Sequence, residues 1–419
     1  MSSHQYDNYP ARECNPRNGI ANAMARLSTG EPLRIAYLGG SITQQKGWRI
    51  ASRLWLQQQY PKARVSEINA ALDGTGSDLG AFRLYRDVLQ HIPDLVFIEF
   101  AVNDSGLPAE RILKSMEGIV RQIWHHLPQC DICFAYTLTH TDTAILQQGR
   151  CTGSQGVMET LADHYGISSI NLGLEIAKLA QDGKVIMKSP DRHIERFPGE
   201  LLDVNSGATR NEQGIIPFSN DGVHPFADTG HQLYLAAFIR AFEQMKSAAA
   251  TGVHHLPAPL HAQNWERAQL LGLSRAMLSG GEQLQPATSP LCDQFGHMVP
   301  ELWRLRTGGR MNFRFAGTVV ALYDLLGPDS GMVQIKLDDH MTQHPRFDPF
   351  CTWTRLAPLW IGEDLPDTPH TVTIEVLPDH FDKRSILFEE NRQDFDLHPE
   401  KYDRYDWHAA AILILGRLL

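Results

Sequence analysis

The strongest constraint on the fold is the regular alternation of strand-like and helix-like segments from residue 32 onward. Short runs rich in apolar and β-forming residues predict strands at Arg34–Leu38, Arg64–Ala70, Leu95–Phe100, Ile132–Thr139 and Ser168–Asn171. Apolar residues at helical spacing predict helices between them, at Trp48–Gln59, Ala81–His91, Ala109–His126, Ser154–Tyr165 and Leu172–Ala180. This alternation is typical of βαβ units, so we expect a three-layer α/β/α domain with a parallel sheet.

The flanking segments set the limits of this first domain. Residues 1–31 form a polar lead-in that ends with an amphipathic stretch, Gly19–Leu27. Residues 181–220 are polar and weakly periodic, and a loop of this length inside a domain is usually functional, so we expect it to frame a pocket. The helix predicted at Asp228–Met245 closes the domain, which we place at residues 32–248.

The remainder of the chain has a different texture. Residues 249–289 are expected to form a connector with one helical piece, Trp265–Leu278. From residue 290 to 419, alternating apolar and polar residues separated by turn signals predict a small antiparallel β-sandwich. Several aromatic residues of this region are expected in its core, with a sugar-binding platform as the alternative: Phe347, Phe350, Trp353 and Trp360.

Composition limits the partners and the location. A chain of 419 residues is long enough for two domains, and its formal net charge of −10, spread without long runs, argues against nucleic acid or an anionic membrane as a partner. The first 12 residues lack the apolar core of a secretory signal, and no stretch approaches the roughly 20 apolar residues of a membrane span. We therefore expect a cytoplasmic protein, and a homo-oligomer is left open.

The cysteines indicate the same kind of compartment. Six cysteines, scattered along a chain of this length, are expected to be free thiols. Cys130 and Cys133 form a C-x-x-C that could be a redox or zinc half-site, but no second pair follows. The apolar sequence around Cys133 favours two thiols in a buried strand.

Four short motifs carry the chemistry. Ser41 lies on a glycine turn between a predicted strand and helix, and a glycine-rich loop that includes Gly74 follows the second strand. Asn103 follows the third strand, and Asp221-x-x-His224 precedes the last helix. Because the carboxyl ends of parallel strands meet at one edge of a sheet, the first three motifs are expected to open on the same edge.

These residue types suit acyl transfer. Serine is a poor nucleophile unless a base takes its proton, which His224 can do while Asp221 orients the ring. The developing oxyanion needs donors, and suitable ones are the Ser41 N–H, the Gly74 N–H and the Asn103 side-chain amide. Taken alone, the Ser41 turn also fits a plain helix N-cap.

In this order and at these spacings, the four motifs resemble the four blocks of the SGNH (GDSL-type) hydrolase family. The resemblance covers about residues 32–245 and implies a flavodoxin-like α/β/α hydrolase domain. It assigns Ser41 as the nucleophile, Asp221 and His224 as its partners, and Gly74 and Asn103 as oxyanion donors. An α/β-hydrolase of the other common type would require Gly-x-Ser-x-Gly, which is not present around Ser41.

The sequence departs from the family pattern at two places. Gly40 stands where the family usually has aspartate, and Ala101 stands where the asparagine block usually starts with glycine. Both variants resemble bacterial members, so we expect activity to be retained. Gly76 is a second candidate for the oxyanion donor of the glycine-rich loop.

Three charged residues near the motifs are further candidates. Arg83 is expected either to contact substrate or, more in keeping with a structural role, to brace Glu99 or Asp104 by an ion pair. Glu99, at the end of an apolar strand, is either a partner near the site or a strand-edge charge.

A metal cluster is a further possibility for the set Asp221, His224, Asp228 and His231, but the triad already accounts for its first two members. We therefore expect no metal and no cofactor.

The resemblance implies a serine esterase that acts on a small-molecule or oligosaccharide ester. An appended β-sandwich is reminiscent of carbohydrate esterases, and the chain lacks the apolar lid expected of a lipase. We therefore expect removal of small acyl groups, with acetyl favoured, from sugars. The alternatives are a short-chain lipid esterase or thioesterase, and a catalytically inactive carbohydrate-binding protein.

Overall fold

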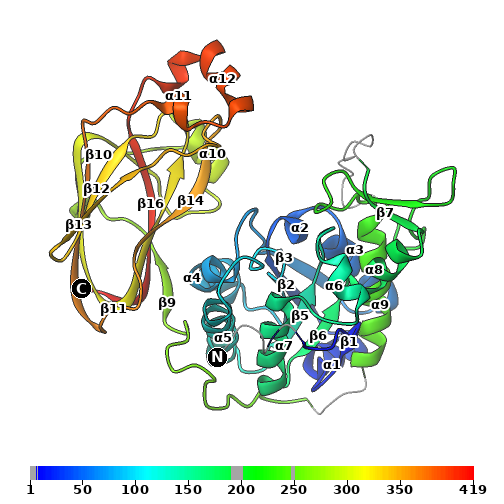
Figure 1. Cartoon of the computed structure of the whole chain (residues 1–419). Helices are drawn as coiled ribbons and strands as arrows, with labels where there is room; N and C mark the ends of the chain where they lie inside the picture. Colours follow the sequence, from blue (N-terminus) through cyan, green and yellow to red (C-terminus); the bar gives the residue numbers. More distant parts are fainter. Residues whose placement is uncertain (1–5, 7, 190–201, 247–250) are drawn as a thin grey trace. The chain divides into compact units, whose positions relative to one another are not determined.

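A mostly parallel sheet of six strands forms the centre of the first part of the chain (Figure 1). The computed structural model describes residues 6, 8–189, 202–246 and 251–419, and it divides the chain into two compact units, Met1–Glu266 and Arg267–Leu419. The sheet order is β1-β6-β5-β4-β2-β3, and all neighbouring pairs are parallel except β1 with β6. The strands are β1 (Cys14–Asn15), β2 (Leu33–Gly39), β3 (Val65–Asn69), β4 (Leu95–Glu99), β5 (Asp131–Tyr136) and β6 (Ser168–Asn171).

Helices cover both faces of this sheet. On one face, α3, α8 and α9 contribute Trp55, Ile176 and Phe238 to the main hydrophobic core, and on the other α4, α5 and α7 pack side by side. Every residue of β4 and β5 is buried, as expected for central strands covered on both faces. The helices of the unit are α1 (Ala21–Thr29), α2 (Ser41–Gln44), α3 (Trp48–Gln59), α4 (Ser77–Asp87), η2 (Leu89–His91), α5 (Ala109–His126), α6 (Thr143–Gln147), α7 (Gly153–Tyr165), α8 (Leu174–Gln181) and α9 (Gly230–Met245).

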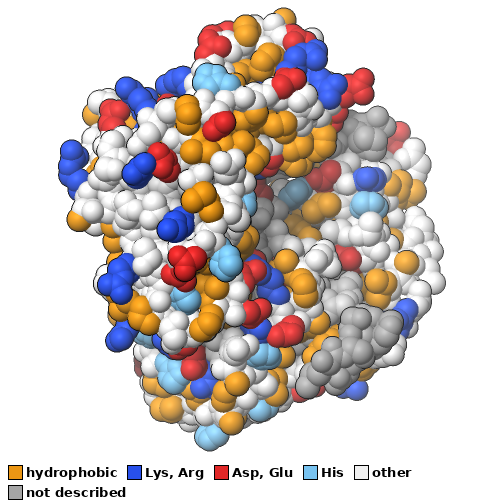
Figure 2. Space-filling model, turned by 60° about the vertical axis from the view of Figure 1, so that its left-hand side comes forward, with side chains coloured by type: hydrophobic (Ala, Val, Ile, Leu, Met, Phe, Trp, Pro, Cys, Tyr) orange, Lys and Arg blue, Asp and Glu red, His pale blue; other side chains and the backbone are white. Residues whose placement is uncertain are grey.

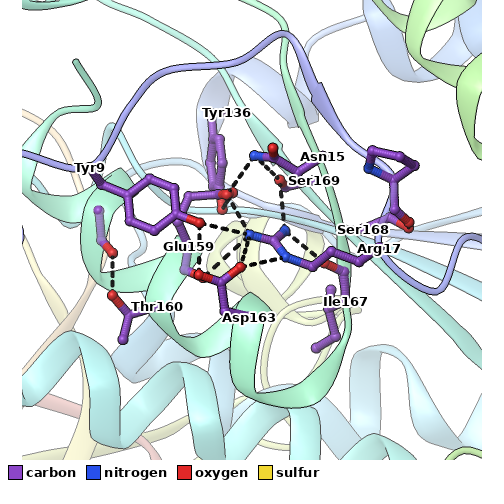
Figure 3. Close-up of polar contacts among 12 residues, drawn as sticks. Tyr9, Asn15, Arg17, Tyr136, Glu159, Thr160, Asp163, Ile167, Ser168 and Ser169 are labelled. Atoms are coloured by element: carbon purple, nitrogen blue, oxygen red, sulfur yellow. Dashed lines mark hydrogen bonds and ion pairs between the residues drawn. The ribbon is translucent and has the colours of Figure 1, made fainter.

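The N-terminal lead-in is fastened to the sheet by a polar network (Figure 3). The guanidinium of Arg17 lies 2.7 Å from a carboxylate oxygen of both Glu159 and Asp163, and the Tyr9 hydroxyl donates to Asp163. Glu159 is almost fully buried, and it also accepts a hydrogen bond from the Tyr136 hydroxyl at 2.7 Å. Removing one partner of a buried charge pair costs several kcal/mol, so this network holds the lead-in in place.

The second unit is an antiparallel β-domain. Its eight-stranded sheet has the order β13-β12-β15-β11-β16-β9, with β10 and β14 also paired to β11. The 24-residue β11 pairs with β10, β14, β15 and β16, and buried side chains such as Phe313, Val333 and Ile414 form one core. The strands are β9 (Ala268–Leu271), β10 (Leu278–Gln283), β11 (Trp303–Leu326), β12 (Met332–Leu337), β13 (His340–Pro345), β14 (Arg355–Gly362), β15 (Thr368–Val376) and β16 (Trp407–Leu418). Short helices complete the unit: η4 (Arg275–Met277), α10 (Pro290–Phe295), α11 (Lys383–Ile386), η5 (Glu389–Asn391), α12 (Arg392–Leu397) and η6 (Pro399–Tyr402).

The expected fold class is confirmed for both units, with local differences. The helix predicted at Trp265–Leu278 is wrong, because Trp265 packs on Gly118 of α5 and residues 268–271 pair with β16 as β9. The predicted loop 181–220 contains two short parallel strands, β7 (Val185–Lys188) and β8 (Ile216–Ser219). Its central part, residues 190–201, lies outside the described residues.

The cysteine side chains of this protein, which all lie within the described residues, form no disulfide. All six cysteines are free thiols, and Cys130, directly before β5, and Cys133, within β5, are both buried rather than exposed as a redox pair. None of the helices in the described parts of the chain is long and apolar enough to cross a membrane. On the face drawn in Figure 2, Lys and Arg side chains are interspersed with Asp and Glu side chains.

The aromatic residues of the β-domain divide between core and surface. Phe347 is buried in a small secondary core, as expected. Phe350 and Trp353 are about half exposed, so the expectation that they lie in the core is wrong, and Trp360 is partly buried. The guanidinium of Arg355 lies 5.6 and 6.0 Å from the ring centroids of Phe350 and Trp353.

Candidate active site

Ser41 stands at the carboxyl end of a central strand. β2 ends at Gly39, Gly40 continues in an extended conformation, and the one-turn helix α2 begins at Ser41 itself. Both glycines are closely surrounded: a Cβ at Gly39 would lie 2.8 Å from the Glu99 carbonyl oxygen. The tight strand-to-helix turn therefore leaves the Ser41 side chain partly exposed at the edge of the sheet, as the sequence predicts.

A chain of short hydrogen bonds joins Ser41 to the Asp221-x-x-His224 motif. The Oγ atom of Ser41 lies 2.8 Å from Nε2 of His224, and Nδ1 of His224 lies 2.6 Å from Oδ2 of Asp221. The carboxylate accepts from Nδ1–H, so Nε2 is the ring nitrogen left to accept the serine proton. Chemically, such an arrangement can supply a nucleophile, a general base and an orienting acid.

The Asp221 carboxylate is fixed by its own turn. Its Oδ1 atom accepts the backbone N–H groups of Val223 and His224, both at 2.8 Å. Partial burial raises the pKa of Asp221, but the hydrogen bonds from His224 and from these amides outweigh burial, and the net pKa is lowered. Asp221 therefore stays ionised at neutral pH, and its negative charge can stabilise an imidazolium on His224.

Asn103 lies against the serine turn, and this explains the glycine at position 40. A Cβ built on Gly40 would lie only 2.1 Å from Oδ1 and 3.0 Å from Nδ2 of Asn103. Any larger residue at position 40 would have to displace the amide. The departure from the usual aspartate is therefore matched to the position of Asn103 in this chain.

The glycine-rich loop is tied to the serine turn by Arg83. This side chain is 1 % exposed, and its guanidinium donates to the carbonyl oxygens of Ala70 and Gly39 and to the Thr75 hydroxyl. Its ion pair is with Asp87, at 2.9 Å, and not with Glu99 or Asp104 as one interpretation of the sequence had it. Arg83 therefore stabilises the glycine-rich loop from the interior of the protein and is not exposed to a substrate.

Gly74 and Gly76 differ in surroundings. Gly74 has a positive φ of 68°, is exposed, and has open space where a Cβ would be. Gly76 packs on Asp104, since a Cβ there would lie 2.4 Å from Oδ1 of that carboxyl. Gly76 directly precedes α4, whereas Gly74 lies in the exposed part of the loop, and the N–H groups of both glycines remain candidate oxyanion donors.

Glu99 is buried directly beneath the serine turn. It is 1 % exposed, and its two carboxyl oxygens accept the hydroxyls of Thr43 and Thr137, each at 2.8 Å. Thr43 belongs to α2 and also accepts the indole N–H of Trp48. Burial raises the pKa of Glu99 to about 7, partly offset by the threonine hydroxyls. Glu99 is thus a buried partner of the turn and not a strand-edge charge.

Asp104, the residue after Asn103, is a second buried carboxyl. Its Oδ1 atom accepts the backbone N–H of Ser77 at 2.9 Å, which fixes the start of α4. Its Oδ2 atom is buried without a hydrogen-bond partner among the described residues. Burial raises the pKa of Asp104 to about 7 as well, and the carboxyl fixes the end of the glycine-rich loop where α4 begins.

The hydrogen bonds of His231 are with residues outside the triad. His231 is buried, 2 % exposed, and its Nδ1 atom accepts the backbone N–H of Trp48 at 3.1 Å. Within the described residues, no group of three or more His, Cys, Asp and Glu side chains is placed to hold a metal ion. The combination of Asp221, His224, Asp228 and His231 is therefore not a metal cluster in this fold.

Part of the first unit is similar to a known family of hydrolases. Residues 37–195 match the model of the GDSL-like lipase/acylhydrolase family. The first unit contains a GDSL-like lipase/acylhydrolase domain. The match to a family of lipases and acylhydrolases supports an ester-hydrolysing enzyme, in agreement with the expectation from the sequence. The matched part of the GDSL-like domain contains Ser41, Gly74 and Asn103, whereas Asp221 and His224 lie beyond it.

Two solved structures extend the likeness to the second unit. A two-domain esterase active on acetylated mannans, co-crystallised with mannopentaose, is 19% identical, with a TM-score of 0.68 over 96% of this chain and 98% of that chain. A second structure of a two-domain esterase active on acetylated mannans gives 19% identity and a TM-score of 0.67 over the same shares. The two-unit fold is therefore shared with these proteins. No curated protein matches the sequence.

Proposed function

We propose that this chain is a serine esterase that removes acetyl groups from carbohydrates through an acyl-enzyme on Ser41. The observation that carries the proposal is the hydrogen-bond chain from Asp221 through His224 to Ser41, with distances of 2.6 and 2.8 Å. Such a chain, at the carboxyl edge of a parallel sheet, supplies the activated nucleophile that acyl transfer needs.

Acylation begins with attack by the Ser41 oxygen on the ester carbonyl carbon while Nε2 of His224 takes the hydroxyl proton. Asp221 stabilises the resulting imidazolium. Negative charge on the carbonyl oxygen is stabilised by the N–H groups of Ser41 and Gly74 and by the side-chain amide of Asn103. When the tetrahedral intermediate collapses, the C–O bond to the sugar breaks and His224 gives its proton to the leaving oxygen.

Deacylation repeats these roles with water. His224 takes a proton from the attacking water, and the new tetrahedral intermediate collapses with return of that proton to the Ser41 oxygen. Acetate leaves and the resting hydrogen-bond chain forms again. The residues of this chain are sufficient for both steps, so the proposal includes no metal and no cofactor.

The choice of substrate rests on analogy with a shared fold. A two-domain esterase with the same two-unit fold acts on acetylated mannans, so acetylated manno-oligosaccharides are the first substrates to test.

A substrate panel tests the proposal. Acetate release from acetylated manno- and xylo-oligosaccharides is compared with hydrolysis of p-nitrophenyl acetate, butyrate and octanoate by wild type, Ser41→Ala and the remote control Ser28→Ala. We expect release of acetate, a preference for acetyl over longer chains, loss of activity in Ser41→Ala and normal activity in the control. A preference for octanoate would indicate a lipid esterase, and no turnover of any ester would indicate an inactive binding protein.

A further inference from the structure

Gln45 is the C-cap of the one-turn helix α2, which begins at the proposed nucleophile. Its backbone N–H donates to the Ser41 carbonyl oxygen at 3.0 Å, which is the i to i+4 hydrogen bond of an α-helix. Residues four apart on a helix share one face, with Cβ atoms roughly 5–6 Å apart. An ester bound at the Ser41 hydroxyl therefore lies within reach of the Gln45 carboxamide.

A buried histidine fixes the direction of this carboxamide. Nδ1 of His231 accepts the N–H of Trp48, so the proton of the neutral ring is on Nε2. Nε2 lies 3.3 Å from Oε1 of Gln45 and donates to it. Burial and the positive charge of Arg49 lower the pKa of His231 to about 3, so the ring remains neutral and this donor is always present.

Because Oε1 of Gln45 faces His231, the amino group of the carboxamide, Nε2, points in another direction. Gln45 is half-buried, and among the described residues no acceptor takes the hydrogens of its Nε2 atom. Buried or half-buried donors are normally satisfied by protein, water or ligand. His231 thus fixes the orientation of the Gln45 carboxamide and leaves its Nε2 atom free to donate to an oxygen atom that enters the site.

The alcohol side of the ester is the part that this donor can reach. The carbonyl oxygen is served by Asn103, which packs on Gly40 at the β4 side of the turn. Gln45 is held instead by His231 on α9, the helix that follows His224 in the chain. His224 must reach the leaving oxygen, so the sugar is expected on the side of the turn that carries His224 and Gln45.

We propose that Gln45 binds substrate by donating a hydrogen bond from Nε2 to a hydroxyl or ring oxygen of the sugar, and that His231 is the positioning residue that fixes its carboxamide. The inference rests on the proposed function, because it assigns a residue to the alcohol part of the same ester. It also gives a role to the one buried histidine beside the serine turn that the acyl-transfer steps do not use.

The test compares two substrates across matched variants. Gln45→Glu keeps the acceptor for His231 but cannot donate, Gln45→Leu removes both functions, and Gln44→Leu changes the neighbouring glutamine as a control. We expect both Gln45 variants to lower kcat/KM for acetylated manno-oligosaccharide by roughly 10–100-fold, the loss for one hydrogen bond to substrate. Hydrolysis of p-nitrophenyl acetate, which has no sugar oxygen, should change by less than about twofold.

The His231 variants test the positioning role. His231→Leu should show the same substrate-selective loss, and the double variant with Gln45→Leu should lose no more than Gln45→Leu alone. Equal losses on both substrates would indicate a purely structural role and overturn the inference, as would unchanged oligosaccharide kinetics in Gln45→Glu. Wild-type activity on p-nitrophenyl acetate without activity on any acetylated sugar would refute the proposed substrate class, and the assignment of Gln45 with it, while leaving the esterase chemistry intact.

Discussion

Replacing Glu99 with glutamine should change the pH dependence of stability in a defined direction. The carboxyl is buried beneath the serine turn and accepts two threonine hydroxyls, and its pKa in the folded protein is raised from 4.5 to about 7. For an acid, a raised folded pKa means that the folded state holds a proton that the unfolded state has already released. The folded state is therefore progressively destabilised as pH rises from about 4.5 through 7.

The magnitude follows from the size of the shift. A change from 4.5 to about 7 corresponds to about 3 kcal/mol at most, of which about 2–3 kcal/mol develops between pH 5 and pH 8. Glu99→Gln has no proton to release, and it keeps an acceptor for Thr43 and a donor toward Thr137. The variant should gain this amount of stability relative to wild type across that interval.

Urea unfolding at pH 5, 6, 7 and 8 measures this difference, with Glu31→Gln as a control because the Glu31 side chain is 59% exposed. Asp104 also has a raised pKa, but it is present in both proteins and its contribution largely cancels in the comparison. A difference between wild type and Glu99→Gln that stays flat with pH, or that grows toward acid, would refute the reasoning.

Two further changes test the geometry around Ser41. Asp221→Asn should lower kcat by roughly 100-fold or more with little change in KM, because the amide no longer stabilises the His224 imidazolium. Steady-state kinetics on p-nitrophenyl acetate measure this effect, and a decrease in kcat below about threefold would contradict the prediction. Gly40→Ala places a Cβ 2.1 Å from Oδ1 of Asn103 and should lower kcat by roughly 100-fold through loss of an oxyanion donor, whereas Gly106→Ala, where a Cβ meets open space, should be near wild type in the same assay.

The main features of the first unit could be predicted from local sequence. The helices Trp48–Gln59 and Ala109–His126 begin and end where the sequence places them, because Gly47 and Pro108 mark their starts and the apolar spacing is regular. The hydrogen-bond chain from Ser41 to His224 and Asp221 is also expected, from the residue types and from the resemblance to the SGNH hydrolase family.

Other features depend on tertiary contacts that no local pattern reports. The fit of Gly40 to the Asn103 amide, and the burial of Glu99 beneath α2, exist only when β2 and β4 are adjacent. The sequence also favoured a helix over residues 265–278, where residues 268–271 instead form a strand that pairs with β16. Arg83 lies four residues before Asp87 on one helix, a spacing that could have identified its partner in advance.

The most direct test of the central claim is covalent labelling of the nucleophile. A fluorophosphonate reacts only with an activated serine, and intact-mass spectrometry followed by peptide mapping counts and locates the adduct. The account predicts one adduct per chain on Ser41, none on that peptide in Ser41→Ala, strongly slowed labelling in His224→Ala and normal labelling in Ser28→Ala. Stoichiometric labelling of a different serine, or an unlabelled Ser41 in a protein that releases acetate, would contradict it.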